Sequence, residues 1–145
     1  CLSFELRFPQ MRDMQKVIPA EAIVYGRLPL MITENCLVQN ETGCRLSEAG
    51  AVVPEQAPCR RPNELQDRTG AKFPLMSAYG HRTEIQNSAL FLADKPEWRR
   101  LGLTYARLRF TTESPEDCAD IYRAYLDGSP APGPFTRGLY YRGVE

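Results

Sequence analysis

The chain has 145 residues, of which 43% are hydrophobic and 25% are charged, and this is the composition of a globular domain with a core of its own. Eighteen Lys and Arg residues balance eighteen Asp and Glu residues, which argues against a protein that holds nucleic acid by bulk charge alone. No apolar run has the length of a transmembrane helix and no signal peptide opens the chain, so we expect a cytoplasmic protein without a membrane partner.

Residues 1–33 predict a barrel-type βαβ segment. CLSFEL reads as a short strand, and RFPQMRDMQK has apolar residues near helical spacing, with Pro9 in the first turn, where its missing N–H is harmless. Residues 22–25 (AIVY) are continuously apolar, which is typical of a strand buried on both faces. A strand, a helix and a strand within this length favour a parallel sheet.

Residues 34–95 predict a Cys-containing, β-rich insert. The first half is rich in Asn, Glu, Gly and Pro, and so long a loop is unusual unless it is functional or stapled. LQDRTGAKFPLMSA, at 65–78, predicts two short strands around a tight turn at its TG dipeptide. RTEIQNSALFLADK, at 82–95, predicts a second pair of strands that bends at its NS dipeptide.

Residues 96–145 predict a returning βα unit and a docked C-terminal tail. PEWRRLG predicts a short helix, and LTYARLRF a strand buried on at least one side. The next helix has the clearest signals, because Ser114 is a suitable N-cap, Pro115 fits the first helical position and Gly128 can end the helix. The sequence therefore predicts an α/β fold in which the cysteine insert interrupts one layered system.

Five cysteines are an odd number, which does not favour the disulfide framework of a secreted domain. Cys1 and Cys118 fall in apolar patterns and are expected to be small buried hydrophobic residues. Cys36, Cys44 and Cys59 lie instead in the polar insert, and in a reducing compartment such a group indicates metal or redox chemistry. Their wide spacing does not match a zinc finger, so three free thiols remain the alternative.

A second group of polar residues is a candidate for substrate binding. Tyr25 and Arg27 leave the end of a predicted buried strand, where barrel enzymes place functional residues, and Arg27 suits an acidic substrate group. Asp67 and Arg68 follow at the predicted turn, where Asp67 is expected to bond backbone amides. The alternative is that Arg27 pairs with Asp67 or Glu21 to close the insert onto the barrel.

Four stretches together carry a family resemblance: SFELRFPQMRDM, EAIVYGRLPLMITENC, LQDRTGAKFPLMSAYGHR and FTRGLYYRGV. They resemble the C-terminal region of the collagenase-like peptidase family of unassigned catalytic type. The resemblance implies that the chain is a piece of a longer protein. This piece would supply the last strands and helices of a TIM-like (β/α) barrel, and the remainder of that barrel would be its partner.

The resemblance also implies a cofactor. In members of that family four cysteines hold an iron–sulfur cluster of the four-iron type, and three of them correspond to Cys36, Cys44 and Cys59. The fourth is usually a Cys followed by Arg, and here this position is His81, the single histidine of the chain. Three cysteines and a histidine are also a known set for structural zinc, which is the alternative metal.

Three functions remain open, and no residue is assigned as catalytic. The first is the C-terminal part of an iron–sulfur enzyme that hydroxylates RNA. The second is a true peptidase acting on a protein substrate, in which Cys44 or Cys59 would pair with His81, although no GxSxG or HExxH motif is present. The third is a non-catalytic accessory module with a structural metal site. In each case we expect the isolated piece to be inactive, because most of the barrel is missing.

Overall fold

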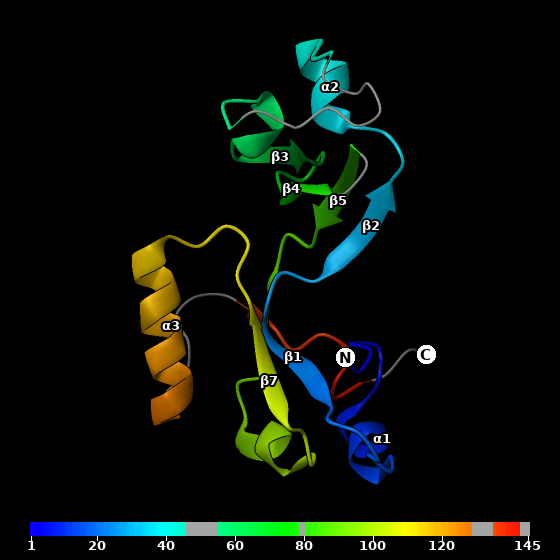
Figure 1. Cartoon of the computed structure of the whole chain (residues 1–145), viewed down its shortest axis with the longest axis vertical. Coiled ribbons are helices and arrows are strands. Elements are labelled where there is room, and N and C mark those ends of the chain that lie inside the picture. The colour runs from blue at the N-terminus through cyan, green and yellow to red at the C-terminus, as the bar shows by residue number, and fades with distance from the viewer. Residues whose placement is uncertain (46–54, 79–80, 129–134, 143–145) are drawn as a thin grey trace. The chain divides into compact units, whose positions relative to one another are not determined.

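The computed structural model describes residues 1–45, 55–78, 81–128 and 135–142 (Figure 1). The chain divides into two compact units. The first unit comprises Cys1–Arg27 and Ala89–Glu145, and the second unit comprises Leu28–Ser88. The fold is mixed α/β, as predicted, with more strands than helices among the described residues.

The first unit contains a four-stranded sheet in the order β7-β1-β6-β8. β1 (Glu21–Gly26) pairs in parallel with β7 (Tyr105–Arg109) on one side. On its other side β1 is antiparallel to β6 (Leu90–Leu92), which in turn pairs in parallel with β8 (Phe135–Thr136). β1 is therefore an inner strand, flanked on both edges.

The apolar sequence of β1 matches this inner position. Residues 22–25 are all buried, and Val24 has no exposed surface. Tyr25 packs with Leu92 of β6 and with Ile121 in the core of the unit. The prediction of a strand buried on both faces is confirmed.

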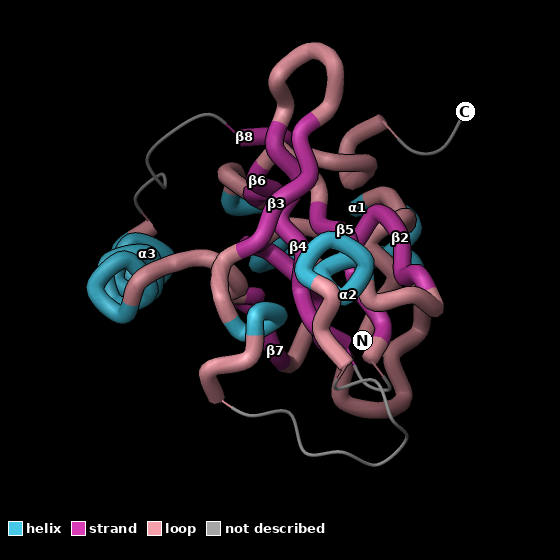
Figure 2. Tube along the Cα trace, turned by 90° about the horizontal axis from the view of Figure 1, so that it is seen from above, coloured by secondary structure: helices cyan, strands magenta, loops and turns pink. Residues whose placement is uncertain are grey.

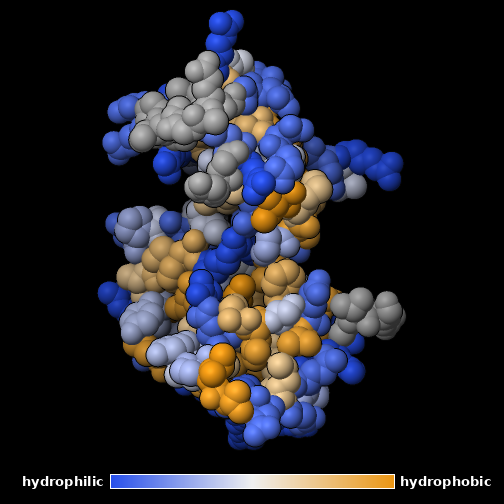
Figure 3. All heavy atoms as spheres, turned by 45° about the vertical axis from the view of Figure 1, so that its right-hand side comes forward, coloured by the Kyte–Doolittle hydropathy of each residue, from blue (hydrophilic) through white to orange (hydrophobic). Residues whose placement is uncertain are grey.

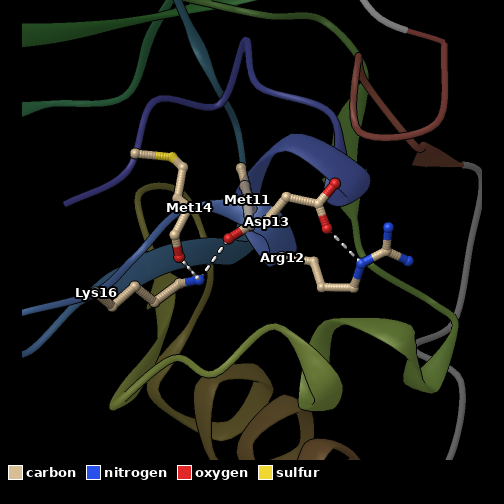
Figure 4. Close-up of polar contacts among 5 residues, drawn as sticks. All are labelled: Met11, Arg12, Asp13, Met14 and Lys16. Carbon is tan, nitrogen blue, oxygen red and sulfur yellow. Dashed lines mark hydrogen bonds and ion pairs between the residues drawn. The ribbon is translucent and has the colours of Figure 1, made fainter.

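Helix α1 (Phe8–Asp13) has the predicted proline in its first turn, and its Gln10 side chain accepts a hydrogen bond from the backbone N–H of Arg7 at 2.9 Å. Figure 4 shows how the helix ends. The ammonium group of Lys16 donates to the carbonyl oxygens of Met11 and Met14, at the end of the helix where carbonyl groups lack intrahelical partners.

The strand predicted over CLSFEL is wrong. Residues 1–6 contain a turn and no strand, and the N–H of Leu2 donates to the carbonyl oxygen of Glu21 at 2.8 Å. The parallel partner of β1 is β7, far along the chain, and not the N-terminal segment. The predicted strand–helix–strand unit is therefore absent from residues 1–33, all of which the structure describes.

Helix α3 (Pro115–Asp127) forms where the local signals predict it. The Ser114 hydroxyl accepts from the N–H of Asp117 at 3.1 Å, and the Asp117 carboxylate accepts from the N–H of Ser114. Gly128 ends the helix with a φ of 74°, a left-handed conformation that glycine adopts at low cost. The short helix predicted over PEWRRLG is a 3₁₀ helix, η2 (Pro96–Arg100).

The C-terminal tail packs into the core of the first unit through Tyr140, which has no exposed surface. Its hydroxyl donates to the carbonyl oxygen of Ile23 at 2.6 Å, and its own carbonyl oxygen accepts from the N–H of Phe8 at 2.9 Å. Nearby, the Arg137 guanidinium makes two hydrogen bonds, of 2.8 and 2.7 Å, to the Asp94 carboxylate.

The second unit is built on an antiparallel sheet in the order β2-β5-β4-β3. Figure 2 looks down on its helix α2. The elements of this unit are β2 (Pro29–Thr33), α2 (Leu37–Thr42), the 3₁₀ helix η1 (Pro58–Arg60), β3 (Asn63–Gln66), β4 (Lys72–Ala78) and β5 (Arg82–Gln86). The predicted pair of strands within 65–78 is confirmed as the β3–β4 hairpin.

The hairpin predicted over 82–95 is wrong. Both strands exist, but they do not pair with each other. β5 pairs with β2 and β4 of the second unit, whereas β6 pairs with β1 and β8 of the first unit. The boundary of the unit lies at Ser88, between these strands, whereas the sequence placed the insert at 34–95.

Apolar side chains also remain at the surface. In β2, Leu30, Met31 and Ile32 are each more than half exposed, and Figure 3 shows apolar areas among hydrophilic ones on the face that it draws. Within the described ranges, no helix combines the length and the apolar character that crossing a bilayer requires.

Candidate functional site

Two of the predicted metal ligands flank helix α2. Cys36 is its N-cap residue, and its carbonyl oxygen accepts from the N–H groups of Gln39 and Asn40. Gly43, with a φ of 66°, ends the helix, and Cys44 follows it. The six residues of α2 and Gly43 therefore lie between the two cysteines.

The other two predicted ligands lie on neighbouring elements. Cys59 belongs to η1, which packs against α2. His81 comes directly before β5, and β5 is tied to the start of α2 because the Thr83 hydroxyl accepts from the N–H of Leu37 at 3.0 Å. The four predicted ligands thus lie in or beside α2, η1 and β5 of the same unit, and both η1 and β5 contact α2.

The side chains themselves do not converge. All five cysteines are free thiols, and in the part of the chain that the structure describes no three His, Cys, Asp or Glu side chains are arranged to hold a metal ion. The donor set fits iron or zinc by its chemistry, because thiolate and imidazole suit both. The metal site at these residues stays a prediction.

His81 has an unusual backbone. Its φ is 60°, the left-handed region, and among the described residues it is the one non-glycine with positive φ. L-residues with a Cβ adopt this conformation at a cost of about 1–2 kcal/mol. Such strain is frequent at functional positions, which is consistent with a role for His81 beyond connecting two strands.

Asp67 organises the β3–β4 turn. Its carboxylate accepts hydrogen bonds from the N–H of Thr69 at 2.8 Å, from the Thr69 hydroxyl at 2.7 Å and from the N–H of Ala71 at 2.9 Å. These bonds, that from the Thr69 side chain first, lower the pKa of Asp67. The predicted bonding of Asp67 to backbone amides is confirmed, while substrate binding by Asp67 and Arg68 stays a prediction.

Tyr25 and Arg27 line a cleft of about 400 Å³ in the first unit. The cleft lies where the parallel strands β1 and β7 end and where the chain enters α3. The C-terminal ends of parallel strands are where α/β proteins generally bind ligands. The predicted strand-end pair is therefore beside a cavity of the size that small ligands require.

Glu113 is the central residue of this cleft, and the sequence reasoning missed it. Its carboxylate accepts from the Tyr25 hydroxyl at 3.0 Å and from the N–H groups of Thr111 at 2.7 Å and Thr112 at 3.0 Å. Burial, and then the charge of Glu113, raises the pKa of Tyr25, so that this phenol stays protonated and donates a hydrogen bond. A sequence signal did exist, since Glu113 lies between a predicted strand and a predicted helix N-cap.

The lining is richer in carboxylates than the sequence suggested. It includes Glu113, Asp117 and Asp120 beside one arginine, Arg27. Asp117 is engaged in the cap of α3 and Asp120 pairs with Arg123. Acceptor oxygens beside one guanidinium suit a ligand that carries hydroxyl groups. Glu21, an expected partner of Arg27, pairs with Arg107 at 2.5 Å.

Gly26 brings β1 close to β7. A Cβ at this position would lie 2.2 Å from the carbonyl oxygen of Arg109, which no arrangement of real atoms permits. In return, the Arg109 guanidinium donates to the carbonyl oxygen of Arg27 at 2.6 Å. This close approach fixes the spacing of β1 and β7 beside Arg27, which lines the cleft.

Comparison with known proteins adds no family assignment, because no family model, no curated protein and no solved structure matches the chain.

Proposed function

We propose that this chain is the C-terminal part of a longer cytoplasmic enzyme of the collagenase-like peptidase type. The first unit would be the end of its TIM-like barrel, and the second unit an insert that carries a metal centre. Support comes from the parallel pair β1 and β7 followed by α3, which is the strand and helix order of such a barrel. β6 departs from an all-parallel barrel, because it is antiparallel to β1.

The observation that carries the metal proposal is that Cys36, Cys44, Cys59 and His81 come from adjoining elements of one unit. Segments far apart in sequence, around α2, η1 and the start of β5, are held together by the packing of η1 on α2 and by the bond from Leu37 to Thr83. A four-iron cluster bound there would supply electron transfer, and zinc would supply only structural support.

We propose hydroxylation of RNA as the reaction of the whole enzyme, with the cleft of the first unit as its substrate-binding site. Tyr25 would donate a hydrogen bond to substrate or hold Glu113 in place, and Glu113 would accept hydrogen bonds from hydroxyl groups such as those of a ribose. Proteolysis is the alternative, and a Cys–His dyad within this chain would use His81, since the chain has one histidine.

Metal and sulfide analysis of the chain tests this proposal directly. The chain is purified without oxygen, supplied with ferrous iron and sulfide, and examined for iron, acid-labile sulfide and visible absorption. We expect about four iron atoms per chain, with loading reduced severalfold in Cys36→Ser, Cys44→Ser and Cys59→Ser. Cys118→Ser is the matched control, because Cys118 lies on α3 in the other unit and should leave loading unchanged.

Two outcomes would contradict the iron–sulfur proposal. Stoichiometric zinc with no sulfide would favour the accessory module, and equal loading in Cys118→Ser and Cys44→Ser variants would indicate adventitious iron.

In the full-length protein, loss of an RNA hydroxylation product in the Glu113→Gln variant would support the reaction. Gelatin cleavage that disappears in His81→Ala would favour the peptidase instead.

A further inference from the structure

A second cavity of about 400 Å³ lies in the first unit and is lined by different residues from the cleft. Its walls come from α1, from η2 with the residue that follows it, and from the C-terminal tail. α1 and η2 pack against each other, so that the cavity is held between two helical turns and the tail. Neither the metal proposal nor the cleft uses any of its residues.

The charged part of this lining is mostly cationic. Arg7, Arg12 and Arg100 contribute three guanidinium groups, and Glu97 is the one carboxylate among the described residues of the lining. Arg12 is engaged through Nε, which lies 2.8 Å from Asp13, and Figure 4 shows this ion pair at the end of α1. Both side chains are more than 60% exposed, so this pair is weak and its guanidinium can serve a second acceptor.

The rest of the lining is aromatic and apolar. Phe8, Tyr140 and Tyr141 form a contact cluster in which the Phe8 ring lies 4.7 Å from Tyr140 and 5.1 Å, edge to face, from Tyr141. Leu101, only 4% exposed, completes this wall. An apolar wall beside several cations suits a ligand with a flat ring at one end and negative charge at the other.

The Tyr141 hydroxyl also indicates a ligand with a hydrogen-bond acceptor. Its oxygen is buried, and within the described part of the chain it has no hydrogen-bond partner, although buried hydroxyl groups nearly always have one. Burial raises the pKa of Tyr141 to about 12, so that the group keeps its proton at neutral pH. An acceptor atom of a bound ligand would satisfy it.

We propose that this cavity binds a nucleotide, either free or as part of a single-stranded RNA. Arg7, Arg12 and Arg100 would hold the phosphate, because the guanidinium fork matches phosphate oxygens. The wall of Phe8 and Leu101 would contact the base, and the Tyr141 hydroxyl would donate to it or to the sugar. This inference goes beyond the proposed function, since it does not depend on any metal ligand.

Calorimetric titration of the chain with adenosine monophosphate, adenosine and inorganic phosphate tests the site. We expect the monophosphate to bind at least tenfold more tightly than either of its parts, because ring and phosphate are recognised together. Arg7→Gln and Arg100→Gln should each weaken binding about tenfold, and Tyr141→Phe, which keeps the ring, severalfold. Arg123→Gln is the matched control, since it removes one exposed arginine that pairs with Asp120 on α3.

Titration with a short single-stranded RNA distinguishes a site for free nucleotide from a site for RNA. Tighter binding of the oligonucleotide than of the monophosphate assigns the site to RNA, and equal binding assigns it to a free nucleotide. The proposal is overturned if no nucleotide binds, if phosphate alone binds as well, or if Arg123→Gln weakens binding as much as Arg100→Gln. Circular dichroism identifies variants that fail to fold, and Cys36→Ser, which disables the proposed metal site, should leave nucleotide binding unchanged.

Discussion

The hydroxyl of Tyr140 donates a 2.6 Å hydrogen bond to the carbonyl oxygen of Ile23, across 117 positions of sequence. Ile23 lies in the inner strand β1, and Tyr140 is fully buried against Phe8 and Phe91. Tyr140 of the tail thus packs against both helix α1 and the central strands of the sheet.

Tyr140→Phe removes this bond and leaves the ring in place. We expect a loss of about 1–2 kcal/mol in the free energy of unfolding, because the buried carbonyl oxygen of Ile23 loses a donor. Denaturant unfolding of the chain measures this loss. Tyr122→Phe is the control, since Tyr122 is 56% exposed and its change should stay within about 0.5 kcal/mol; equal effects in both variants would show that the bond contributes nothing.

Gly26→Ala should destabilise the first unit strongly. Gly26 has a φ of 129°, and an added Cβ would lie only 2.2 Å from the Arg109 carbonyl oxygen, so we expect a loss of at least about 3 kcal/mol. Gly128→Ala separates the two causes, because Gly128 also has positive φ but nothing within 4 Å of its Cβ position. That variant should lose only about 1 kcal/mol in the same unfolding measurement, and a similar loss for both would mean that β1 and β7 can move apart freely.

The ion pair of Asp94 with Arg137 predicts that the free energy of unfolding decreases in acid. The hydrogen bond from Arg137 lowers the pKa of Asp94 in the folded state, so its contribution is present above the unfolded pKa of about 3.9 and is lost as the pH falls through the lower folded value. Asp94→Asn should therefore cost up to about 1 kcal/mol at neutral pH and progressively less in acid.

Unfolding of wild type and Asp94→Asn across this pH range measures the difference. Asp120→Asn, at an exposed pair on α3, should show a smaller one. A gap between wild type and Asp94→Asn that stays constant as the pH falls below about 3.9 would exclude the carboxylate charge as its cause, since the unfolded state takes up a proton there before the folded state does.

Buried tyrosines predict a loss of stability in alkali. Burial raises the pKa values of Tyr25, Tyr125 and Tyr140 in the folded state, so their contribution is complete below the unfolded pKa of about 10 and is lost as the pH rises above it. Each should lower the free energy of unfolding by up to about 1.4 kcal/mol per pH unit.

Unfolding at several alkaline pH values, with tyrosinate absorbance recorded in parallel, checks this dependence. Tyr140→Phe should flatten the alkaline slope, whereas Tyr122→Phe, at an exposed position, should not. If the alkaline slope of the unfolding free energy were the same in both variants, Tyr140 would not have a raised pKa in the folded state.

His81→Gly should separate backbone strain from metal binding. Because His81 has a φ of 60°, glycine there should stabilise the metal-free chain by about 0.5 kcal/mol, while it removes a proposed ligand. Iron loading should fall severalfold in His81→Gly and be kept in His81→Cys, which restores a soft donor. Full loading of the glycine variant would remove His81 from the proposed ligand set.

Local signals determined what could be predicted of the fold. Helix α3 was predictable because Ser114, Pro115 and Gly128 act within its own length, and the β3–β4 hairpin because Asp67 closes its turn with neighbouring amides. Strand partners depend on distant segments instead. The bend between β5 and β6 resembles a hairpin in sequence, yet each strand finds its partners in a different unit.

The candidate site shows the same limit. Tyr25 and Arg27 were identifiable because strand ends carry functional residues, but the role of Glu113 depends on the parallel pairing of β1 with β7, which brings residues 88 positions apart into contact. For the cysteines, sequence could indicate donor chemistry but not that a helix would form between Cys36 and Cys44.

The second unit is one unbroken segment, and its two ends are joined by a 2.9 Å hydrogen bond from the N–H of Asn87 to the carbonyl oxygen of Leu28. Because the segment leaves and re-enters at adjacent residues, it can be lengthened, replaced or exchanged for a short linker during evolution. Such changes leave the register of the strands in the first unit unaltered.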